Sequence, residues 1–268
     1  MIKAGVLGSP ISHSLSPLLH TTAYRYLGIE GDYRAYEVAS GGLADFLQTL
    51  GKDLTSLSLT MPLKEEALSI ADHVSNISKQ IASGNTLSKK EDGWHLTSTD
   101  VEGFTFALKA VADVQYDKVL IIGAGATARA VAAACNVSST SLTVVGRSEK
   151  RHESIRHSAP LAKIEFIDWE ARPDLDVYDL VINTTPANTA ISFISAVNAP
   201  KGVFFEVIYN PWPTDLLSKW QQTGATYVDG LDLLIHQAIS QVQIFTGKEI
   251  DRTSMAHLLR VEALKALQ

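Results

Sequence analysis

The stretch KVLIIGAGATARAVAAAC, residues 118–135, contains an apolar strand, a glycine-rich turn and a helix in immediate succession. Gly123, Gly125 and Ala128 fit the pattern G-x-G-x-x-[G/A]. The first glycine of this pattern permits a tight turn and the second lets the backbone approach a pyrophosphate, while the helix N-terminus offers free N–H groups. The surrounding strand and helix favour this interpretation over an ordinary turn with incidental glycines. The predicted dinucleotide contacts are Gly123, Ala124, Gly125, Ala126, Thr127 and Ala128.

Short apolar runs alternate with amphipathic stretches on both sides of this motif, which is typical of parallel strands joined by helical crossovers. We expect strands at residues 3–8, 33–39, 56–62, 118–123, 141–147, 178–186, 202–210 and 226–230. We expect helices at residues 16–28, 43–51, 63–74, 126–137, 214–225, 231–247 and 254–268, and a hairpin at 84–100 with Asp92-Gly93 at its turn. The fold class is therefore α/β, in two halves that meet within residues 101–114, where a crossing helix would set a ligand cleft.

Composition and charge exclude several classes of protein. The chain has 268 residues, of which 46% are hydrophobic and 19% charged, so it can bury a core and is not disordered. Its one cysteine, Cys135, cannot form an internal disulfide, which fits a reducing compartment. A net charge of −6 disfavours binding to nucleic acid. Neither a leader pattern nor an uninterrupted apolar span is visible, so we expect a cytoplasmic protein with no membrane partner.

The strand after the glycine-rich turn bears on the choice of dinucleotide. In NAD-binding proteins a carboxylate near this point holds the ribose 2′-hydroxyl, whereas an arginine suits the 2′-phosphate of NADP. This strand ends in Gly146, Arg147 and Ser148, with Lys150 and Arg151 close behind. A guanidinium can hold a phosphate through paired hydrogen bonds. We therefore predict NADP as cofactor, with Arg147, Ser148 and Arg151 near the phosphate; a solvated basic corner is the alternative.

Polar residues follow three apolar strands in the first half of the chain. Ser14 and Ser16 precede Pro17 at a helix start, where their hydroxyls could cap the helix or bind a carboxylate. Lys64 opens a helix whose first turn favours acidic residues, so its position is unusual, although a solvated lysine is the simpler interpretation. Asp100 ends the predicted hairpin and could be an ordinary N-cap.

Taken together, these segments resemble the shikimate dehydrogenase family along essentially the whole chain. The resemblance rests on the motifs GSPISHSLSP, SLTMPLK, GNTL, TSTDVEGF, GAGATA, INTTP, EVIYNPWPT and DGLDLLIHQA, in that order. It implies NADPH-dependent, reversible reduction of 3-dehydroshikimate to shikimate in the route through chorismate to the aromatic amino acids. It also implies an N-terminal α/β substrate domain, residues 1–101 plus 235–268, and a Rossmann domain for NADP, residues 102–234. The resemblance leaves a monomer and a homodimer open.

The resemblance also assigns roles to individual residues. It places Lys64 and Asp100 as the catalytic pair, with Lys64 as general acid and base. It assigns the substrate carboxylate to Ser14 and Ser16. The remaining substrate contacts that it implies are Ser58, Thr60, Asn85, Tyr209 and Gln237, and the remaining cofactor contacts are Thr184, Ile208 and Gly230. The nicotinamide supplies the hydride, so we expect no metal.

The chain departs from the family pattern at three places. The family usually has Asn at the positions of Ser58 and Ser98, and Asn-Arg-Thr where this chain has Gly146, Arg147 and Ser148. The shorter Ser58 leaves room for a water. We expect these changes to affect substrate affinity more than the reaction class, and the arginine that supports NADP is kept.

Two other functions compete with this interpretation. One is a related dehydrogenase that uses quinate or aminoshikimate. The other is a catalytically silent protein that binds shikimate or a dinucleotide, for which loss of Lys64 or Asp100 would be the mark; both are present. His152 and His157 have the wrong spacing for a zinc protease motif, and no Cys–His cluster is visible, so we predict no metal site.

Overall fold

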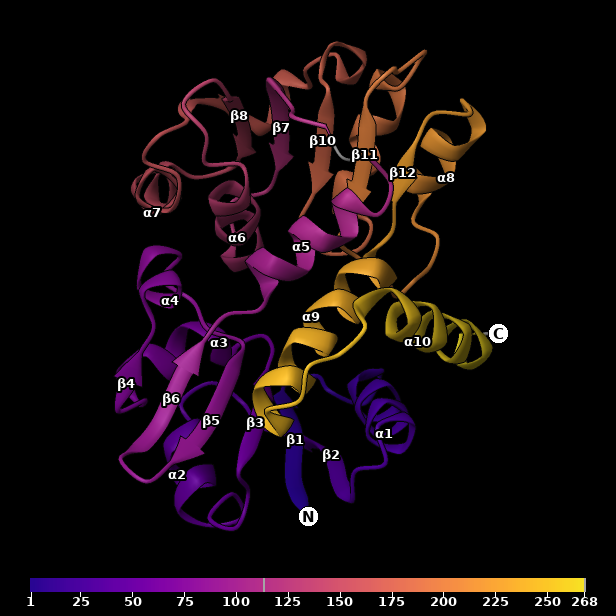
Figure 1. Cartoon of the computed structure of the whole chain (residues 1–268). Helices are drawn as coiled ribbons and strands as arrows, with labels where there is room; N and C mark the ends of the chain where they lie inside the picture. Colours follow the sequence, from indigo (N-terminus) through magenta and orange to yellow (C-terminus); the bar gives the residue numbers. More distant parts are fainter. Residues whose placement is uncertain (113, 268) are drawn as a thin grey trace. The chain divides into compact units, whose positions relative to one another are not determined.

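The computed structural model describes residues 1–112 and 114–267. It divides into two compact units, which we call unit 1 (Met1–Gly103 with Leu234–Gln268) and unit 2 (Phe104–Leu233). The chain leaves unit 1 within helix α5 (Asp100–Lys109) and returns within helix α9 (Gly230–Thr246) (Figure 1). Strands and helices alternate in both units, which confirms the predicted α/β class.

Unit 1 is built on one six-stranded sheet. Its strands are β1 (Ile2–Gly8), β2 (Gly31–Glu37), β3 (Ser56–Leu59), β4 (His73–Val74), β5 (Thr86–Lys90) and β6 (Gly93–Thr97). Its helices, besides those shared with unit 2, are α1 (Ser16–Tyr26), α2 (Leu43–Gln48), α3 (Leu63–Glu66), α4 (Asn76–Gln80) and α10 (Arg252–Ala266), with a 3-10 turn at Ala67–Ser69.

The strand order in unit 1 is β2-β1-β3-β5-β6-β4, and only β5 runs antiparallel to its neighbours. The carboxyl ends of β1, β3 and β6 therefore lie at the same edge of the sheet as the start of β5. One face carries the apolar row Leu57, Leu87 and Leu96, all in the core. The other face carries polar rows because side chains alternate along each strand. We use the name polar edge for the end of the sheet at which the carboxyl ends of β1, β3 and β6 lie; it does not refer to an outer strand.

The predicted helix at residues 63–74 is wrong in its second half. Helix α3 ends at Glu66, and His73–Val74 form the short strand β4, which pairs with β6. Long-range hydrogen bonds explain the difference: the Asp72 carboxylate accepts from the N–H of Trp94 at 2.8 Å, and the N–H of Ser75 donates to the carbonyl of Leu96 at 2.9 Å. These bonds to β6 outweigh the local helical pattern.

The predicted hairpin at residues 84–100 is present, with a shifted turn. Lys90 lies opposite Gly93 in the register of β5 and β6, so the two turn residues are Glu91 and Asp92. Gly93 is the first residue of β6 and has a φ of +120°, a conformation that favours glycine.

Unit 2 contains a second six-stranded sheet. Its strands are β7 (Lys118–Ile122), β8 (Ser141–Gly146), β9 (Lys163–Asp168), β10 (Leu180–Asn183), β11 (Val203–Glu206) and β12 (Tyr227–Val228). Its helices are α6 (Ala126–Ala134), α7 (His152–Ser158) and α8 (Asp215–Gln222), with 3-10 turns at Glu149–Arg151, Trp169–Ala171, Leu175–Val177 and Thr189–Ala196. Strand β9 and helix α7 were not among the predicted elements.

All strand pairs of unit 2 are parallel, in the order β12-β11-β10-β7-β8-β9. Figure 1 labels the first five strands of this order. This is the doubly wound order of a Rossmann sheet, which confirms the predicted dinucleotide-binding architecture. From β7 the next strands are added on one side of the sheet as far as β9, and β10–β12 are added on the other side. Ligands of such sheets bind where the direction changes, between β7 and β10, beyond the carboxyl ends of the strands.

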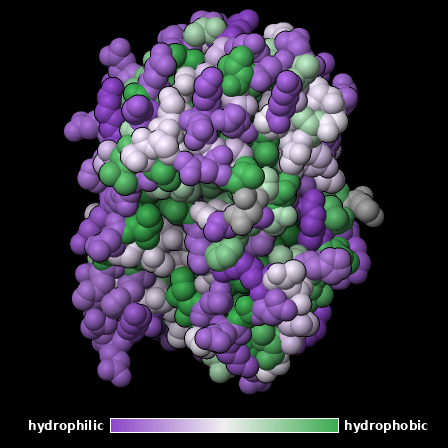
Figure 2. Space-filling model, turned by 45° about the horizontal axis from the view of Figure 1, so that its top comes forward, coloured by the Kyte–Doolittle hydropathy of each residue, from purple (hydrophilic) through white to green (hydrophobic). Residues whose placement is uncertain are grey.

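Among the described residues, no helix combines the length and the apolar composition needed to span a bilayer. Hydrophilic residues make up most of the face shown in Figure 2, with hydrophobic residues scattered among them. Scattered apolar residues of this kind are normal on the surface of a folded protein.

Candidate active site

A lysine and an aspartate meet at the polar edge of unit 1. Lys64 lies in α3, just after β3, and Asp100 is the first residue of α5, just after β6. The Nζ atom of Lys64 lies 2.6 Å from Oδ2 of Asp100, and the two side chains are only 17% and 10% exposed. The pair is therefore largely shielded from water, where an ion pair is stronger than at the surface.

This geometry removes the two simpler interpretations. Lys64 is not a solvated lysine, because its ammonium is paired and mostly covered. Asp100 is not an N-cap, because it lies inside the helix and its two oxygens accept from the side chains of Lys64 and Asn85.

Asn85 joins the pair to a wider polar cluster. This buried residue precedes β5, and its Nδ2 atom donates to Oδ1 of Asp100 at 2.8 Å and to Oε1 of Gln237 at 3.3 Å. Its Oδ1 atom accepts from the N–H of Thr99 at 2.8 Å. The amide is thus fixed from both ends. Gln237, on α9, in turn donates to the carbonyl of Leu234 at 2.8 Å.

Ser14 lies on the loop between β1 and α1, and Ser16 is the first residue of α1. The N-cap residue of α1 is Leu15, which makes no side-chain cap hydrogen bond. The Ser14 hydroxyl accepts from the N–H of Ser16 at 3.3 Å, so it satisfies one donor at the start of the helix from the position before the N-cap. Thr60, directly after β3, is half-buried and its N–H donates to the carbonyl of Leu7 at 2.9 Å. All three residues follow strands that end at the polar edge.

Ser58 belongs to a buried chain of hydrogen bonds beneath this edge. The Tyr33 hydroxyl donates to Ser58 Oγ at 2.6 Å, and Ser58 donates to Oε1 of Gln241 at 2.7 Å. His20 Nε2 lies 3.3 Å from the same Gln241 oxygen. The Gln241 amide donates onward to the carbonyl of Asn85 at 3.0 Å. One lone pair of Ser58 remains for a further donor.

Sequence reasoning missed His20, Tyr33 and Gln241. A signal was present, since Gln241 lies four residues after Gln237 and therefore on the same face of the helix. Burial lowers the pKa of His20 to about 3, so its ring is neutral, and burial raises the pKa of Tyr33. A neutral ring that donates from Nε2 satisfies Gln241 without adding a buried charge.

The glycine-rich turn of unit 2 is shaped to receive an anion. Gly123 has a φ of +108°, and a Cβ there would lie 2.6 Å from Oγ1 of Thr184. Thr184 itself donates to the carbonyl of Ile122 at 2.9 Å, which ties the ends of β10 and β7 together. A Cβ at Gly125 would point into open space. Helix α6 has neither a side-chain cap nor an acidic residue in its first turn. Its N–H groups and dipole thus suit a phosphate.

Arg147 is exposed at the end of β8, and its guanidinium carbon lies 5.9 Å from the centre of the Trp169 ring. Ser148 accepts from the N–H of Lys150 at 3.3 Å, and Arg151 ends the following 3-10 turn. A carboxylate that sequence reasoning did not weigh also lies here, because Gly146 pairs with Asp168. The Oδ1 atom of Asp168 accepts from the N–H of Glu170 at 2.9 Å and caps the 3-10 turn that follows.

Three family models match successive parts of the chain. They describe the shikimate dehydrogenase substrate binding domain (residues 6–87), shikimate / quinate 5-dehydrogenase (105–202) and the shikimate 5′-dehydrogenase C-terminal domain (230–260). An NADP(+) shikimate dehydrogenase from Nostoc sp. is 32% identical over 264 residues, covering 91% of each chain. The protein belongs to the shikimate dehydrogenase family. The resemblance predicted from its motifs is confirmed.

Solved structures of this family have the same fold. Shikimate dehydrogenase of Mycobacterium tuberculosis is 33% identical, with a TM-score of 0.86 over 97% of this chain and 99% of that one. Shikimate 5-dehydrogenase of Thermus thermophilus in complex with NADP(H) and shikimate is 29% identical, with a TM-score of 0.83 over 98% and 100%.

Further family residues come together around a buried carboxylate in unit 2. Glu206, at the end of β11, accepts from Asn183 at 3.0 Å, from Thr214 at 2.7 Å and from the N–H of Ile208 at 3.1 Å. Burial raises the pKa of Glu206. This network fixes Ile208, and a Cβ at Gly230 would lie 2.5 Å from the Ile208 carbonyl, so these two predicted residues are neighbours.

The predicted site residues thus form two groups, one in each unit. In unit 1 one set of hydrogen bonds joins Lys64, Asp100, Asn85 and Gln237, and a second set joins Ser58 to Tyr33 and Gln241. In unit 2 the glycine-rich turn adjoins Thr184. Tyr209 follows Ile208 and is half-buried.

Proposed function

We propose that the protein catalyses the reversible, NADPH-dependent reduction of 3-dehydroshikimate to shikimate. The observation that carries this proposal is the shielded pair of Lys64 and Asp100, held by Asn85 at the edge of the sheet where the strands of unit 1 end. A silent binding protein has no need of a shielded ion pair at this position. The reaction is that of the relatives named above, which are NADP(+) shikimate dehydrogenases.

NADPH, when bound, supplies the hydride. Lys64 stabilises the negative charge that develops on the substrate oxygen and donates a proton to it from Nζ. In the oxidation direction the neutral amine takes the proton back. Asp100 accepts a hydrogen bond from Nζ at 2.6 Å and fixes its direction, while Asn85 holds the other carboxylate oxygen. The lysine is thus oriented before substrate arrives, which lowers the reorganisation that the reaction requires.

The other residues of unit 1 bind and orient the substrate. Ser14 and Ser16 provide small hydroxyl donors for its carboxylate, near the N-terminus of α1. Thr60, Asn85 and Gln237 contact the ring hydroxyls, and Ser58 supports them through Gln241 and offers its free lone pair. These assignments make unit 1 the substrate domain.

Unit 2 is the NADP domain in this proposal. The turn from Gly123 to Ala128 receives the pyrophosphate, and Arg147, with Ser148 and Arg151 beside it, receives the 2′-phosphate. Thr184, Ile208, Tyr209 and Gly230 complete the nicotinamide end. The open space at Gly125 and the uncapped N-terminus of α6 support this assignment.

The test is a rate measurement with four pairs of reactants. 3-Dehydroshikimate and 3-dehydroquinate are each offered with NADPH and with NADH, and oxidation of the cofactor is followed. We expect fast turnover only with 3-dehydroshikimate and NADPH. A preference for 3-dehydroquinate would identify a quinate-type enzyme, and preference for NADH would contradict the assignment of Arg147. Binding of shikimate without any turnover would identify the silent binding protein.

We also propose that the protein acts in the cytoplasm on small molecules alone, as a monomer or a homodimer, without a nucleic-acid or membrane partner. The net charge of −6 and the single cysteine support this. Light scattering coupled to gel filtration distinguishes the two assembly states.

A further inference from the structure

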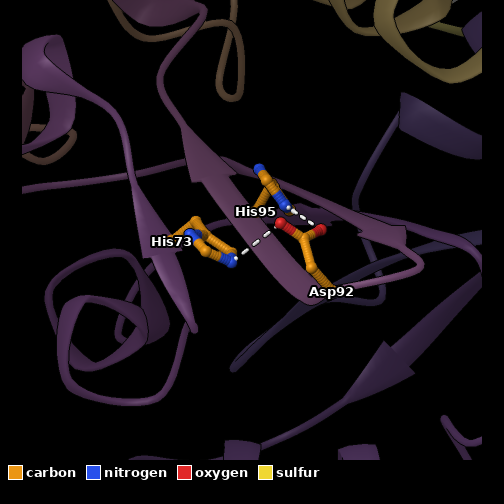
Figure 3. Close-up of side chains that lie close together, drawn as sticks. All are labelled: His73, Asp92 and His95. Carbon is orange, nitrogen blue, oxygen red and sulfur yellow. Dashed lines mark hydrogen bonds and ion pairs between the residues drawn. The ribbon is translucent and has the colours of Figure 1, made fainter.

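Two histidines and an aspartate lie together toward the end of the unit 1 sheet that is opposite to the polar edge and the proposed active site. His73 comes from β4, His95 from β6 and Asp92 from the turn between β5 and β6. Figure 3 shows both imidazole rings beside the Asp92 carboxylate, one at each oxygen. Because β5 runs from the polar edge toward this turn, Asp92 lies at the opposite edge of the sheet.

The three side chains converge on a small volume. His73 Nε2 lies 3.0 Å from one Asp92 oxygen, and His95 Nε2 lies 2.7 Å from the other. One potential ligand atom from each residue lies within 4.8 Å of the other two. A tetrahedral zinc ion with bonds of about 2.0–2.1 Å places its ligand atoms roughly 3.4 Å apart. Small rotations of these side chains, of which His73 and Asp92 are exposed and His95 is half-buried, would reach that spacing.

The backbone holds this arrangement in register. His73 lies directly opposite His95 in the parallel pairing of β4 with β6. The carboxylate of Asp72 accepts from the N–H of Trp94 at 2.8 Å, which joins the start of β4 to β6. A Cβ at Gly93 would collide with this Asp72 carboxylate, so the close approach of the turn to β4 depends on the glycine.

We propose that His73, Asp92 and His95 form a binding site for a divalent transition metal, of which Zn²⁺ is the representative. Two imidazole nitrogens and one carboxylate oxygen are the donor set of open zinc sites and leave a fourth position for water. Each neutral imidazole would shift its proton from Nε2 to Nδ1, which turns the Nε2 lone pair to the ion. Mg²⁺ and Ca²⁺ are excluded because they prefer sites made of oxygen ligands.

Solvent can reach the site from a groove in the same sheet face. Both imidazoles line a cavity of about 670 Å³, together with Ser88 and the lysines Lys89 and Lys90. The groove gives the ion an entry path, and Lys90 would attract an anionic fourth ligand. The Lys89 ammonium is engaged elsewhere, since it donates to the carbonyl of Lys52 at 3.0 Å and lies 5.7 Å from the centre of the Trp94 ring. No metal site was predicted from the sequence, because its histidines are scattered along the chain and no Cys–His cluster is visible. The strand pairing of β4 supplies the missing proximity.

The test is calorimetric titration of the untagged protein with Zn²⁺ and, separately, with Mg²⁺. We expect one Zn²⁺ per chain and no binding of Mg²⁺. His73→Ala and His95→Ala should each weaken Zn²⁺ binding by about tenfold to a hundredfold or more, since even supporting residues of metal sites have effects of this size. His257→Ala is the matched control, because this histidine is exposed on α10, outside the cluster, and the variant should bind as the unaltered protein does.

A second variant and a spectrum complete the test. Asp92→Asn preserves the shape of the side chain and should also weaken binding. Co²⁺ offered in place of Zn²⁺ should give a visible absorption band that the His73→Ala variant lacks. Basal reductase activity should stay unchanged in all three cluster variants, which separates this proposal from the proposed function. Equal Zn²⁺ affinity in His73→Ala, His95→Ala and His257→Ala would overturn it.

Discussion

The Tyr33 hydroxyl donates a hydrogen bond of 2.6 Å to Ser58, and the Ser58 hydroxyl donates one of 2.7 Å to Gln241. Ser58 occupies a position at which the family usually has asparagine, so a shorter side chain has taken its place. The phenol of Tyr33 therefore connects strand β2 with the helix that carries Gln237 and Gln241, and Ser58 is the link between them.

Removal of the Ser58 hydroxyl should lower the free energy of unfolding and raise the KM for 3-dehydroshikimate. Ser58→Ala leaves the buried Tyr33 hydroxyl without its acceptor, at a cost of about 1–3 kcal/mol. Urea denaturation measures the loss. Tyr33→Phe breaks the same bond, so the double variant should lose less stability than the sum of the single losses. Strictly additive losses would show that the two side chains act independently.

Lys64→Ala should lower kcat by roughly 10²–10⁴, because general acid–base assistance is lost, with a smaller change in KM. Steady-state rates in both directions measure the effect. Lys79→Ala is the control, since Lys79 is an exposed lysine on α4 of the same unit. A near-normal kcat in Lys64→Ala would remove this lysine from the chemistry.

Asp100→Asn should cause a loss of kcat comparable to that of Lys64→Ala. The variant preserves the shape of the side chain but removes the charge that orients Nζ of Lys64 at 2.6 Å. Since it also disturbs the Asn85 contact, KM should rise as well. Thermal unfolding of the variant verifies that the fold is intact. An effect on KM alone would mean that Asp100 binds substrate without orienting the lysine.

Arg147→Ala should raise the KM for NADPH by about tenfold to a hundredfold. This is the loss of affinity expected when one charge-assisted hydrogen bond to the 2′-phosphate is removed. The KM for NADH should hardly change, because NADH lacks the 2′-phosphate. Lys163→Ala serves as the control, since this exposed lysine begins β9 at the other end of the sheet from Arg147. Equal effects on both cofactors would point to general electrostatic attraction instead.

His20 should make the protein less stable in acid. Its pKa is about 3 in the folded state because of burial, against an ordinary value of 6.5. The unfolded chain therefore binds a proton between these values and the folded protein does not. Stability from this group is complete above about pH 6.5 and falls by up to about 1.4 kcal/mol per pH unit below it.

His20→Phe tests this dependence, since it keeps a ring stacked on Tyr33, whose centre lies 4.0 Å away. Denaturation at a series of pH values should show a shallower loss in the variant. His236, whose pKa burial lowers to about 4, titrates in both proteins and cancels in the comparison. Parallel curves for the two proteins would mean that His20 does not contribute.

Local patterns were sufficient to predict most strands and helices of unit 2, whereas Lys64 and Asp100 were assigned as a pair only through the resemblance to the family. The strand, turn and helix at residues 118–135 are encoded by glycine spacing and apolar periodicity, both of which are local. Lys64 and Asp100 could be singled out, but their contact could not be derived. It depends on β5 lying between β3 and β6, which is a property of the whole sheet.

Long-range contacts account for what sequence reasoning missed. His20 and Gln241 are separated by 221 residues, and each looks ordinary on its own helix. Strand β4 has only two residues, and its pairing with β6 overrides the helical pattern of residues 63–74. Asp168 was overlooked because its proximity to Gly146 follows from the pairing of β9, a strand that was not predicted.

Unit 1 consists of two stretches of chain separated by unit 2, and this sets the order in which the two units can fold during translation. All of Phe104–Leu233 is synthesised before Leu234 appears, so unit 2 can complete its sheet while unit 1 still lacks α10 and most of α9. Until those helices emerge, Ser58 and Asn85 have no Gln241 to bind. Nascent chains usually fold their first domain first. Here the unit that begins earlier in the sequence is the one that must wait for a segment translated after the other unit.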